Sequence, residues 1–214
     1  MNFNGLVIMH DIFLQNLLKA FIAIDPLSLL PLFVVLTSKL ELKKILELSF
    51  LVFIITSSVL TFFSIFGNKF LMFMGVSINS FQIIGGIFLL FISFEMVFEK
   101  RIKRKKNMAN EILDDNQIKN IATFPLSIPL VAGPSAITLS VLISEDLDYN
   151  FLEFYQKIFP VILVLLLTSL IIFFSNYIYK LLNETVIKIL QKVFGLILGA
   201  LSVEFISNGI KGML

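Results

Sequence analysis

Apolar residues dominate six stretches of the chain, and shorter polar segments separate them. The stretches cover residues 12–37, 48–66, 78–98, 121–143, 158–178 and 190–210. Each is close to the roughly 20 residues that a helix needs to cross the hydrocarbon core of a bilayer. The pattern predicts an all-α integral membrane protein with six transmembrane helices.

The composition agrees with this class. Of the 214 residues, 57% are hydrophobic and 24 are phenylalanine, and the mean hydropathy is +0.95. A soluble domain of this size has no interior large enough for so much apolar surface. The chain has no cysteine, which excludes disulfides, a thiolate nucleophile and a cysteine-ligated metal. The single histidine, His10, is expected at the membrane interface, and no metal or other cofactor is expected.

One long polar segment, Glu99 to Asn120, divides the chain into two halves with three spans each. Residues 1–98 form the first predicted repeat, 99–120 a basic linker and 121–214 the second repeat, all within one membrane domain. Lys and Arg number three in 38–47, seven in 99–120 and three in 179–192, against only Lys69, Lys157 and Lys211 on the other side. The positive-inside rule therefore predicts a cytoplasmic linker with both termini outside. The run KRIKRKK is interpreted as this topology signal, and no nucleic-acid partner is expected.

The two halves share spaced residues. The third and sixth spans repeat one pattern 109 residues apart: Gln82, Gly86, Ser93 and Glu95, then Gln191, Gly195, Ser202 and Glu204. Ser58 with Phe62-Phe63-Ser64 recurs as Ser169 with Phe173-Phe174-Ser175, and Asp25-Pro26 aligns with Gly133-Pro134. A unit with an odd number of spans must enter the membrane upside down the second time. The sequence predicts an inverted-topology repeat, which is the plan of many secondary transporters.

The first and fourth spans contain residues that interrupt helices. Pro26 and Pro31 lack the N–H that a helix interior needs, and each disfavours a helical conformation at the residue before it, Asp25 or Leu30. The fourth span, FPLSIPLVAGPSA, carries three prolines and a glycine. Irregular backbone at membrane depth is tolerated where protein buries it or where it lines a cavity. We therefore expect both spans to be broken at proline, with the two breaks facing each other.

The breaks predict a binding site. Asp25-Pro26 and Gly133-Pro134 each match a helix N-cap followed by a first-turn proline. The free amides of Ser135 and Ala136 could receive a carboxylate, and Asp25 could receive an ammonium group. A small zwitterion would match this pair of groups, with its carboxylate at the amides and its ammonium group at Asp25. The predicted substrate-binding residues are Asp25, Pro26, Ser28, Gly133, Pro134, Ser135 and Ala136. The alternative is that the prolines only shape packing and Asp25 only caps its helix.

Two acidic residues occupy equivalent places in the repeats. Glu95 and Glu204 lie within one or two turns of a span end, where long side chains can reach the interface. Their symmetric positions make them candidates for ion-coupling or gate residues, with an interfacial role as the alternative. The motifs Gly85-Gly86 and Gly195–Gly199 are expected to let helices cross closely.

At these residues the sequence resembles the MarC family of six-span bacterial membrane proteins. The matching segments are DPLSLLPLF (Asp25–Phe33), FQIIGGIFLL (Phe81–Leu90), FPLSIPLVAGPSAIT (Phe124–Thr138) and EFISNGI (Glu204–Ile210). The resemblance implies transport of neutral amino acids across the bacterial plasma membrane. Family members typically have glycine after the Gly-Pro pair, where this chain has Ser135, so its cavity is expected to be narrower or to carry an extra hydroxyl.

Three functions compete at this point. The leading one is a secondary transporter for a small neutral amino acid, driven by H⁺ or Na⁺, because no Walker-type phosphate loop is present. A passive channel or exporter for small polar solutes would use the same broken helices. An accessory membrane protein without transport activity is the third. An enzyme is not expected, and the expected partners are the lipid bilayer and a small solute, with a homo-oligomer compatible with the sequence.

Overall fold

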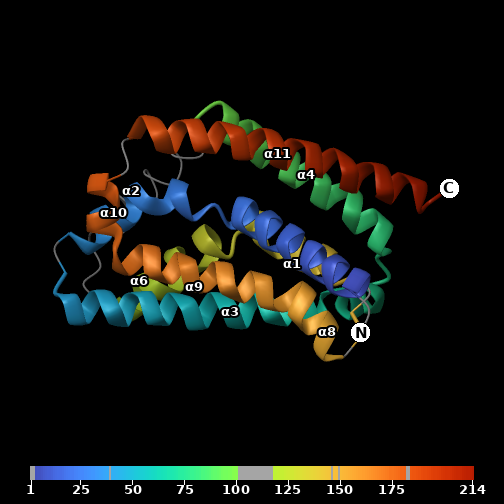
Figure 1. The fold of residues 1–214 in the computed structure, drawn as a ribbon, viewed down its shortest axis with the longest axis horizontal. Helices are drawn as coiled ribbons and strands as arrows, with labels where there is room; N and C mark the ends of the chain where they lie inside the picture. The colour runs from blue at the N-terminus through green and yellow to red at the C-terminus, as the bar shows by residue number, and fades with distance from the viewer. Residues whose placement is uncertain (1–2, 39, 101–117, 146, 149, 182–183) are drawn as a thin grey trace.

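A computed structural model describes residues 3–38, 40–100, 118–145, 147–148, 150–181 and 184–214, and these residues form helices joined by short turns. The described part of the chain contains no strand (Figure 1). The elements in chain order are α1 (Phe3–Ile24), α2 (Pro26–Thr37), α3 (Leu42–Phe73), α4 (Ile78–Val97), α6 (Ile118–Ile121), the π-helix η1 (Ala122–Val131), α7 (Pro134–Ile143), α8 (Phe151–Glu153), the π-helix η2 (Phe154–Ile158), α9 (Phe159–Phe173), α10 (Ser175–Leu181) and α11 (Glu184–Lys211).

Four of the apolar stretches are continuous helices long enough to cross a membrane. They are α3, α4, the run Phe151–Phe173 and the part Thr185–Lys211 of α11. Two further candidates are bent pairs: Asp11–Ile24 with Pro26–Thr37 turns by 46°, and Ala122–Val131 with Pro134–Ile143 turns by 62°. The described residues therefore give an all-helical protein with four candidate spans, or six when each bent pair is one span.

One local expectation about the first span is wrong. Pro31 does not push Leu30 out of helical geometry, because α2 runs through it from Pro26 to Thr37. The neighbouring Leu29, Leu30 and Leu32 are almost fully buried. Their packing offsets the hydrogen bond that Pro31 cannot make. The bend lies instead at Asp25, between α1 and α2.

Helices α4 and α11 form an antiparallel pair that lies along one side of the molecule (Figure 1). A Cβ atom added to Gly86 would lie 2.8 Å from the carbonyl oxygen of Ser202. One added to Gly195 would lie 3.2 Å from the carbonyl oxygen of Ser93. The two contacts are reciprocal, because Gly195 lies 109 positions after Gly86 and Ser202 lies 109 positions after Ser93. The expected packing role of these glycines agrees with this geometry.

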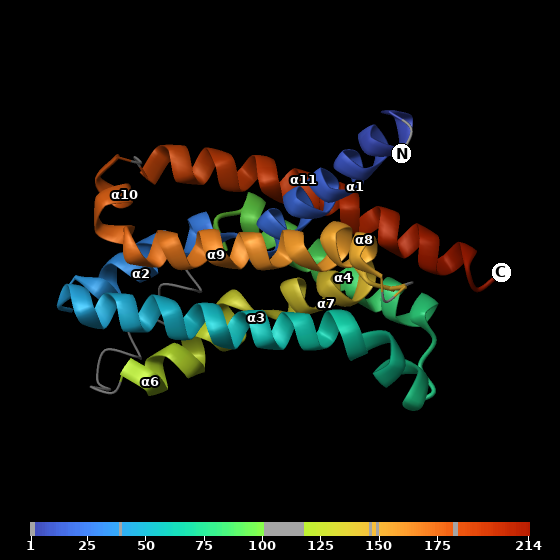
Figure 2. The same ribbon diagram turned by 60° about the horizontal axis from the view of Figure 1, so that its bottom comes forward.

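The remaining helices build the main core. Helix α3 packs beside α9, and in Figure 1 α1 lies between these two helices and the α4–α11 pair; Figure 2 shows the same helices turned by 60°. The main apolar cluster includes Ala23, Ile24, Ala132 and Ala136, which flank the two bends. A smaller cluster around Leu89, Met96 and Leu198 joins α4 to α11. The residues at the two bends, Asp25 and Gly133, are therefore buried beside this core.

The two ends of the molecule differ in the segments they hold. Both chain termini, the turn at 74–77 and the end of α7 at 144–145 lie at one end, called here the terminal end (Figure 1). The end of α2, helix α10 and the start of α11 lie at the other, the linker end (Figures 1 and 2). Of the predicted basic linker, only 99–100 and 118–120 are among the described residues.

Candidate functional site between two helix breaks

The first break is centred on Asp25. Its backbone has φ 53° and ψ 62°, in the left-handed region that few residues other than glycine and Asn/Asp adopt. The Asp25 carboxylate caps α2, accepting hydrogen bonds from the backbone N–H of Ser28 at 3.4 Å and from the Ser28 hydroxyl. Pro26 follows as the first residue of α2. The predicted N-cap and first-turn proline are both confirmed here.

The second break is longer than the first. Within η1, the residues before two prolines are extended: Phe124 has φ −136° and ψ 130°, and Ile128 has φ −129° and ψ 122°. This is the conformation that a following proline favours. Gly133 then starts α7 as its N-cap, with Pro134 as the first helical residue. The fourth span is thus interrupted over more than one turn, which the Gly133-Pro134 pair alone did not predict.

Gly133 occupies a position where a side chain would collide with backbone. A Cβ atom there would lie 2.7 Å from the carbonyl oxygen of Pro129. Its φ of −82° and ψ of 176° suit any residue, so the requirement for glycine comes from this close approach and not from backbone strain. Because Gly133 has no side chain, no cap from it covers the first amides of α7.

The two breaks meet, as the sequence predicted. The hydroxyl of Ser135, in the first turn of α7, donates a 2.9 Å hydrogen bond to the carbonyl oxygen of Ala23, in the last turn of α1. Both residues are buried, with exposed fractions of 3% and 1%. The N-terminus of α7 is therefore fixed against the break at Asp25.

Burial and charge distinguish the members of this region. Asp25, Ser28 and Ala136 are each 2% exposed, whereas Pro134 is exposed. Two helix N-termini, those of α2 and α7, begin in this buried region, and each carries a partial positive charge. The Asp25 carboxylate lies at the first of these termini. Such an arrangement can hold a carboxylate at one pole and an ammonium group at the other.

The two symmetric acids have different surroundings. Glu95 is 8% exposed on the inner face of α4, while Glu204 is exposed on α11. An interfacial or lipid-headgroup location therefore suits Glu204 better than Glu95. Their coupling or gate role stays a prediction.

Sequence reasoning missed Ser127, which lies between the two prolines of η1. Its side chain is fully buried, and its hydroxyl has no hydrogen-bond partner among the described residues. Its carbonyl accepts the N–H of Ala132 at 2.8 Å, which closes η1 just before the break. A serine enclosed by Pro125 and Pro129 in an apolar span was the signal that could have identified it.

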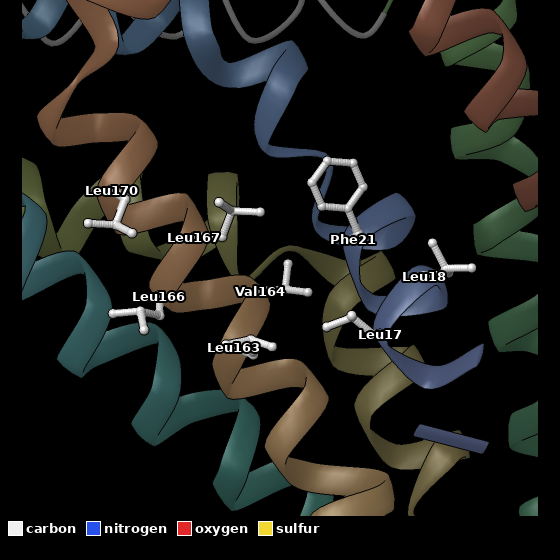
Figure 3. Close-up of a pocket in the computed structure, with 8 residues that line it drawn as sticks. All are labelled: Leu17, Leu18, Phe21, Leu163, Val164, Leu166, Leu167 and Leu170. Carbon is white, nitrogen blue, oxygen red and sulfur yellow. The ribbon is translucent and has the colours of Figure 1, made fainter. Parts of the chain in front are cut away.

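An apolar cavity of about 400 Å³ lies between α1 and α9 (Figure 3). Aliphatic side chains and Phe21 line it: Leu17, Leu18, Phe21, Leu163, Val164, Leu166, Leu167 and Leu170. Phe21 is one turn before the break, and its carbonyl accepts the N–H of Asp25 at 2.9 Å. None of the predicted polar site residues lines this cavity, so it is not the predicted solute site.

These features define a class: a polytopic helical membrane protein with two interrupted segments that meet inside the protein. Comparison with known proteins gives the family. Residues 10–214 match the family described as "MarC family integral membrane protein". The chain therefore belongs to the MarC family of integral membrane proteins.

Relatives match along nearly their whole length. The chain is 34% identical over 209 residues to a UPF0056 membrane protein of Methanocaldococcus jannaschii, covering 94% of this chain and 98% of the relative. It is 32% identical over 194 residues to one from Buchnera aphidicola subsp. Acyrthosiphon pisum, covering 87% and 86%. It is 28% identical over 204 residues to YhcE of Escherichia coli K12, covering 94% and 93%. No solved structure matches the chain.

Proposed function

We propose that this protein is a secondary transporter of small neutral amino acids, such as glycine or alanine, driven by an H⁺ or Na⁺ gradient. The observation that carries the proposal is the hydrogen bond from Ser135 to Ala23, which joins the two breaks beside the buried Asp25. An aspartate in a membrane-spanning segment costs roughly 2.5–3.5 kcal/mol on insertion scales, so a chain that retains one gains something from it.

The proposed substrate lies between the two helix N-termini. Its carboxylate is bound by the backbone amides of Ser135 and Ala136, where no side chain from Gly133 caps α7. Its ammonium group lies beside the Asp25 carboxylate. Because the Ser135 hydroxyl is already donated to Ala23, the amide of Ser135 is the group that contacts the substrate. Pro26, Ser28, Gly133 and Pro134 shape the two helix starts.

Burial favours a carrier over a passive channel. A channel needs a continuous water-filled path, but Asp25, Ser28, Ser135 and Ala136 are at most 3% exposed. A solute can then reach the site only through a conformational change, which is the property of alternating access. An ion-coupling or gate role for Glu95 and Glu204 belongs to this proposal.

The proposed architecture is six spans in two inverted repeats, with the linker 99–120 in the cytoplasm and both termini outside the plasma membrane. The two bent pairs each count as one span in this plan. The reciprocal contacts of Gly86 with Ser202 and of Gly195 with Ser93 support a two-fold relation between the halves. Solute sites between discontinuous helices at the repeat interface are common in such transporters.

Uptake into liposomes tests the proposal. Purified protein should take up radiolabelled glycine or alanine faster when an H⁺ or Na⁺ gradient is imposed, and the rate should saturate with concentration. Liposomes without protein and liposomes with the gradient dissipated are the controls. Unsaturable uptake that ignores the gradient would favour a passive channel, and absence of uptake of any amino acid by folded protein would favour an accessory role.

A further inference from the structure

Hydrogen bonds join α3, α4 and the residue that follows the end of α7 at the terminal end of the molecule. The side-chain amide of Gln82, in the first turns of α4, donates a 2.6 Å hydrogen bond to the carboxylate of Glu145, just after α7. The amide of Asn68, on α3, donates to the backbone carbonyl of Glu145 at 2.7 Å. These contacts, called here the terminal latch, fix α4 against α7 at this end.

A related group of contacts lies at the linker end. The repeat spacings of 109 and 108 residues relate Gln82 to Gln191 and Glu145 to Thr37. The second and fifth spans are offset by 111 residues, so Asn176 lies three residues before the position equivalent to Asn68. The amide of Asn176 donates to the Thr37 hydroxyl at 3.2 Å, and that hydroxyl also contacts the Ser175 hydroxyl at 2.8 Å. Thr37, Ser175 and Asn176 are called here the linker-end cluster. In each half, an asparagine side chain therefore contacts Glu145 or its counterpart Thr37.

Gln191, the residue equivalent to Gln82, makes no hydrogen bond to the linker-end cluster. Its side chain is 2% exposed, and neither its amide nitrogen nor its amide oxygen has a hydrogen-bond partner among the described residues. A buried amide without partners costs free energy, and native structures rarely keep one without a reason. The equivalent Gln82 is bonded. Of these two equivalent glutamines, Gln82 is therefore hydrogen-bonded and Gln191 is not.

The α4–α11 pair links these two residues mechanically. Gln82 lies on α4 and Gln191 on α11, and the two helices are in close contact through Gly86 and Gly195. The pair contacts α7, α1, α2 and α3. At α7 the approach is close, because a Cβ atom added to Gly85 would lie 2.4 Å from the side chain of Thr138. If the pair tilts as a rigid body, separation of α4 from α7 at the terminal end would bring the start of α11 closer to the end of α2.

We propose that Gln82 and Gln191 are alternating latches, and that Gln191 bonds to the linker-end cluster when the terminal latch opens. This structure then represents the state closed at the terminal end, with the solute site occluded. The inference rests on the proposed function for the meaning of the motion. It adds the residues that hold the two states: Gln82 with Glu145 in one, and Gln191 with Thr37, Ser175 or Asn176 in the other.

Cysteine labelling tests the latches without any substrate. The chain has no cysteine, so Leu142→Cys gives a single reactive site with no background. Leu142 is 6% exposed and lies at the contact of α7 with α4, where its Cδ1 is 3.6 Å from the Cβ position of Gly85. The quantity to measure is its reaction rate with a membrane-impermeant maleimide in proteoliposomes, with the reagent supplied on the side of the terminal end.

Gln82→Ala in this background should raise the labelling rate about tenfold, which corresponds to loss of one hydrogen bond to a charged group. Gln191→Ala is the matched control: it removes the same side chain from the released latch, and the rate should stay unchanged or fall. Gln82→Glu places a carboxylate against Glu145 and should also raise the rate. It therefore tests the same point if Gln82→Ala does not yield a single species in gel filtration.

Two results would overturn the proposal: a rate unchanged by either Gln82 variant in folded protein, or equal acceleration by Gln82→Ala and Gln191→Ala. The test is separate from that of the proposed function. If labelling changes as expected while liposomes take up no amino acid, the latches stand and the proposed substrate is wrong.

Discussion

Ser135 and Ala23 are 112 residues apart in the sequence, and a single 2.9 Å hydrogen bond joins the hydroxyl of the first to the carbonyl oxygen of the second. The carbonyl of Ala23 lies just before the break at Asp25, where regular helical bonding of α1 ends. The hydrogen bond from Ser135 to this carbonyl joins the broken segment of the first half to that of the second half inside the protein. The site proposed above depends on this tie.

Ser135→Ala should lower the stability of the protein while leaving its helix content intact. The substitution leaves the buried carbonyl of Ala23 without the Ser135 hydroxyl, a loss of about 1–3 kcal/mol. Thermal unfolding in detergent, followed by circular dichroism, measures the effect. Ser58→Ala is the matched control, since the exposed Ser58 hydroxyl only donates to Ile54 of its own helix. Equal melting temperatures for the two variants would contradict the role given to Ser135.

The sequence predicted the breaks well because their causes are local. A proline cannot donate, an aspartate before it caps the next helix, and a glycine before Pro134 leaves the amides open. The structure has α2 starting at Pro26 and α7 starting at Pro134. The meeting of the breaks followed from the cost of unsatisfied backbone in lipid.

Other features depend on contacts that no local pattern encodes. Pro31 was expected to disturb α2, but the burial of its neighbours keeps the helix regular. The hydrogen bond from Gln82 to Glu145 joins residues 63 positions apart, and nothing near either residue indicates it. The different burial of Glu95 and Glu204 likewise arises from tertiary packing, since their sequence positions are equivalent.

Asp25→Asn should reduce gradient-driven uptake by about tenfold or more while the protein remains folded. Asparagine caps a helix as well as aspartate does and can still accept from Ser28, so stability should change by less than about 1 kcal/mol. The negative charge that the substrate ammonium needs is lost, which costs about 1.5–3 kcal/mol of binding. Initial uptake rates and gel filtration of the same preparation measure both effects.

The control for this variant is Asp11→Asn, the same change at an exposed residue of α1. Its uptake should equal that of the unmodified protein. If Asp25→Asn also transports at the unmodified rate, the carboxylate of Asp25 is only a helix cap and does not bind the ammonium group.

Gly86→Ala should destabilise the protein more than Gly195→Ala does. The new methyl group at Gly86 would approach the Ser202 carbonyl oxygen to 2.8 Å, whereas the one at Gly195 would approach that of Ser93 to 3.2 Å. Overpacking of this kind costs about 1–3 kcal/mol, and backbone atoms yield less readily than side chains. Melting temperatures of the two variants in one detergent give the ranking. A lower melting temperature for Gly195→Ala than for Gly86→Ala would contradict this ranking of the two contacts.

The orientation in the membrane is testable with two further cysteine variants. Val76→Cys lies in an exposed turn at the terminal end, and Ser38→Cys is exposed at the linker end. Because Lys and Arg concentrate at the linker end, that end should face the cytoplasm. In intact cells, an impermeant maleimide should label Val76→Cys and spare Ser38→Cys until the membrane is permeabilised. The opposite labelling pattern would invert the proposed topology.

Ligand-dependent thermal stability tests the central claim most directly, because it asks whether the joined breaks bind both charges of a zwitterion. Alanine binds only the folded protein in this account, so it should raise the melting temperature, by an amount equivalent to about 2.7 kcal/mol at a hundred times its dissociation constant. Propionate, which lacks the ammonium group, and alaninamide, which lacks the carboxylate, should not. A melting temperature unmoved by alanine, or moved equally by propionate, would contradict the account.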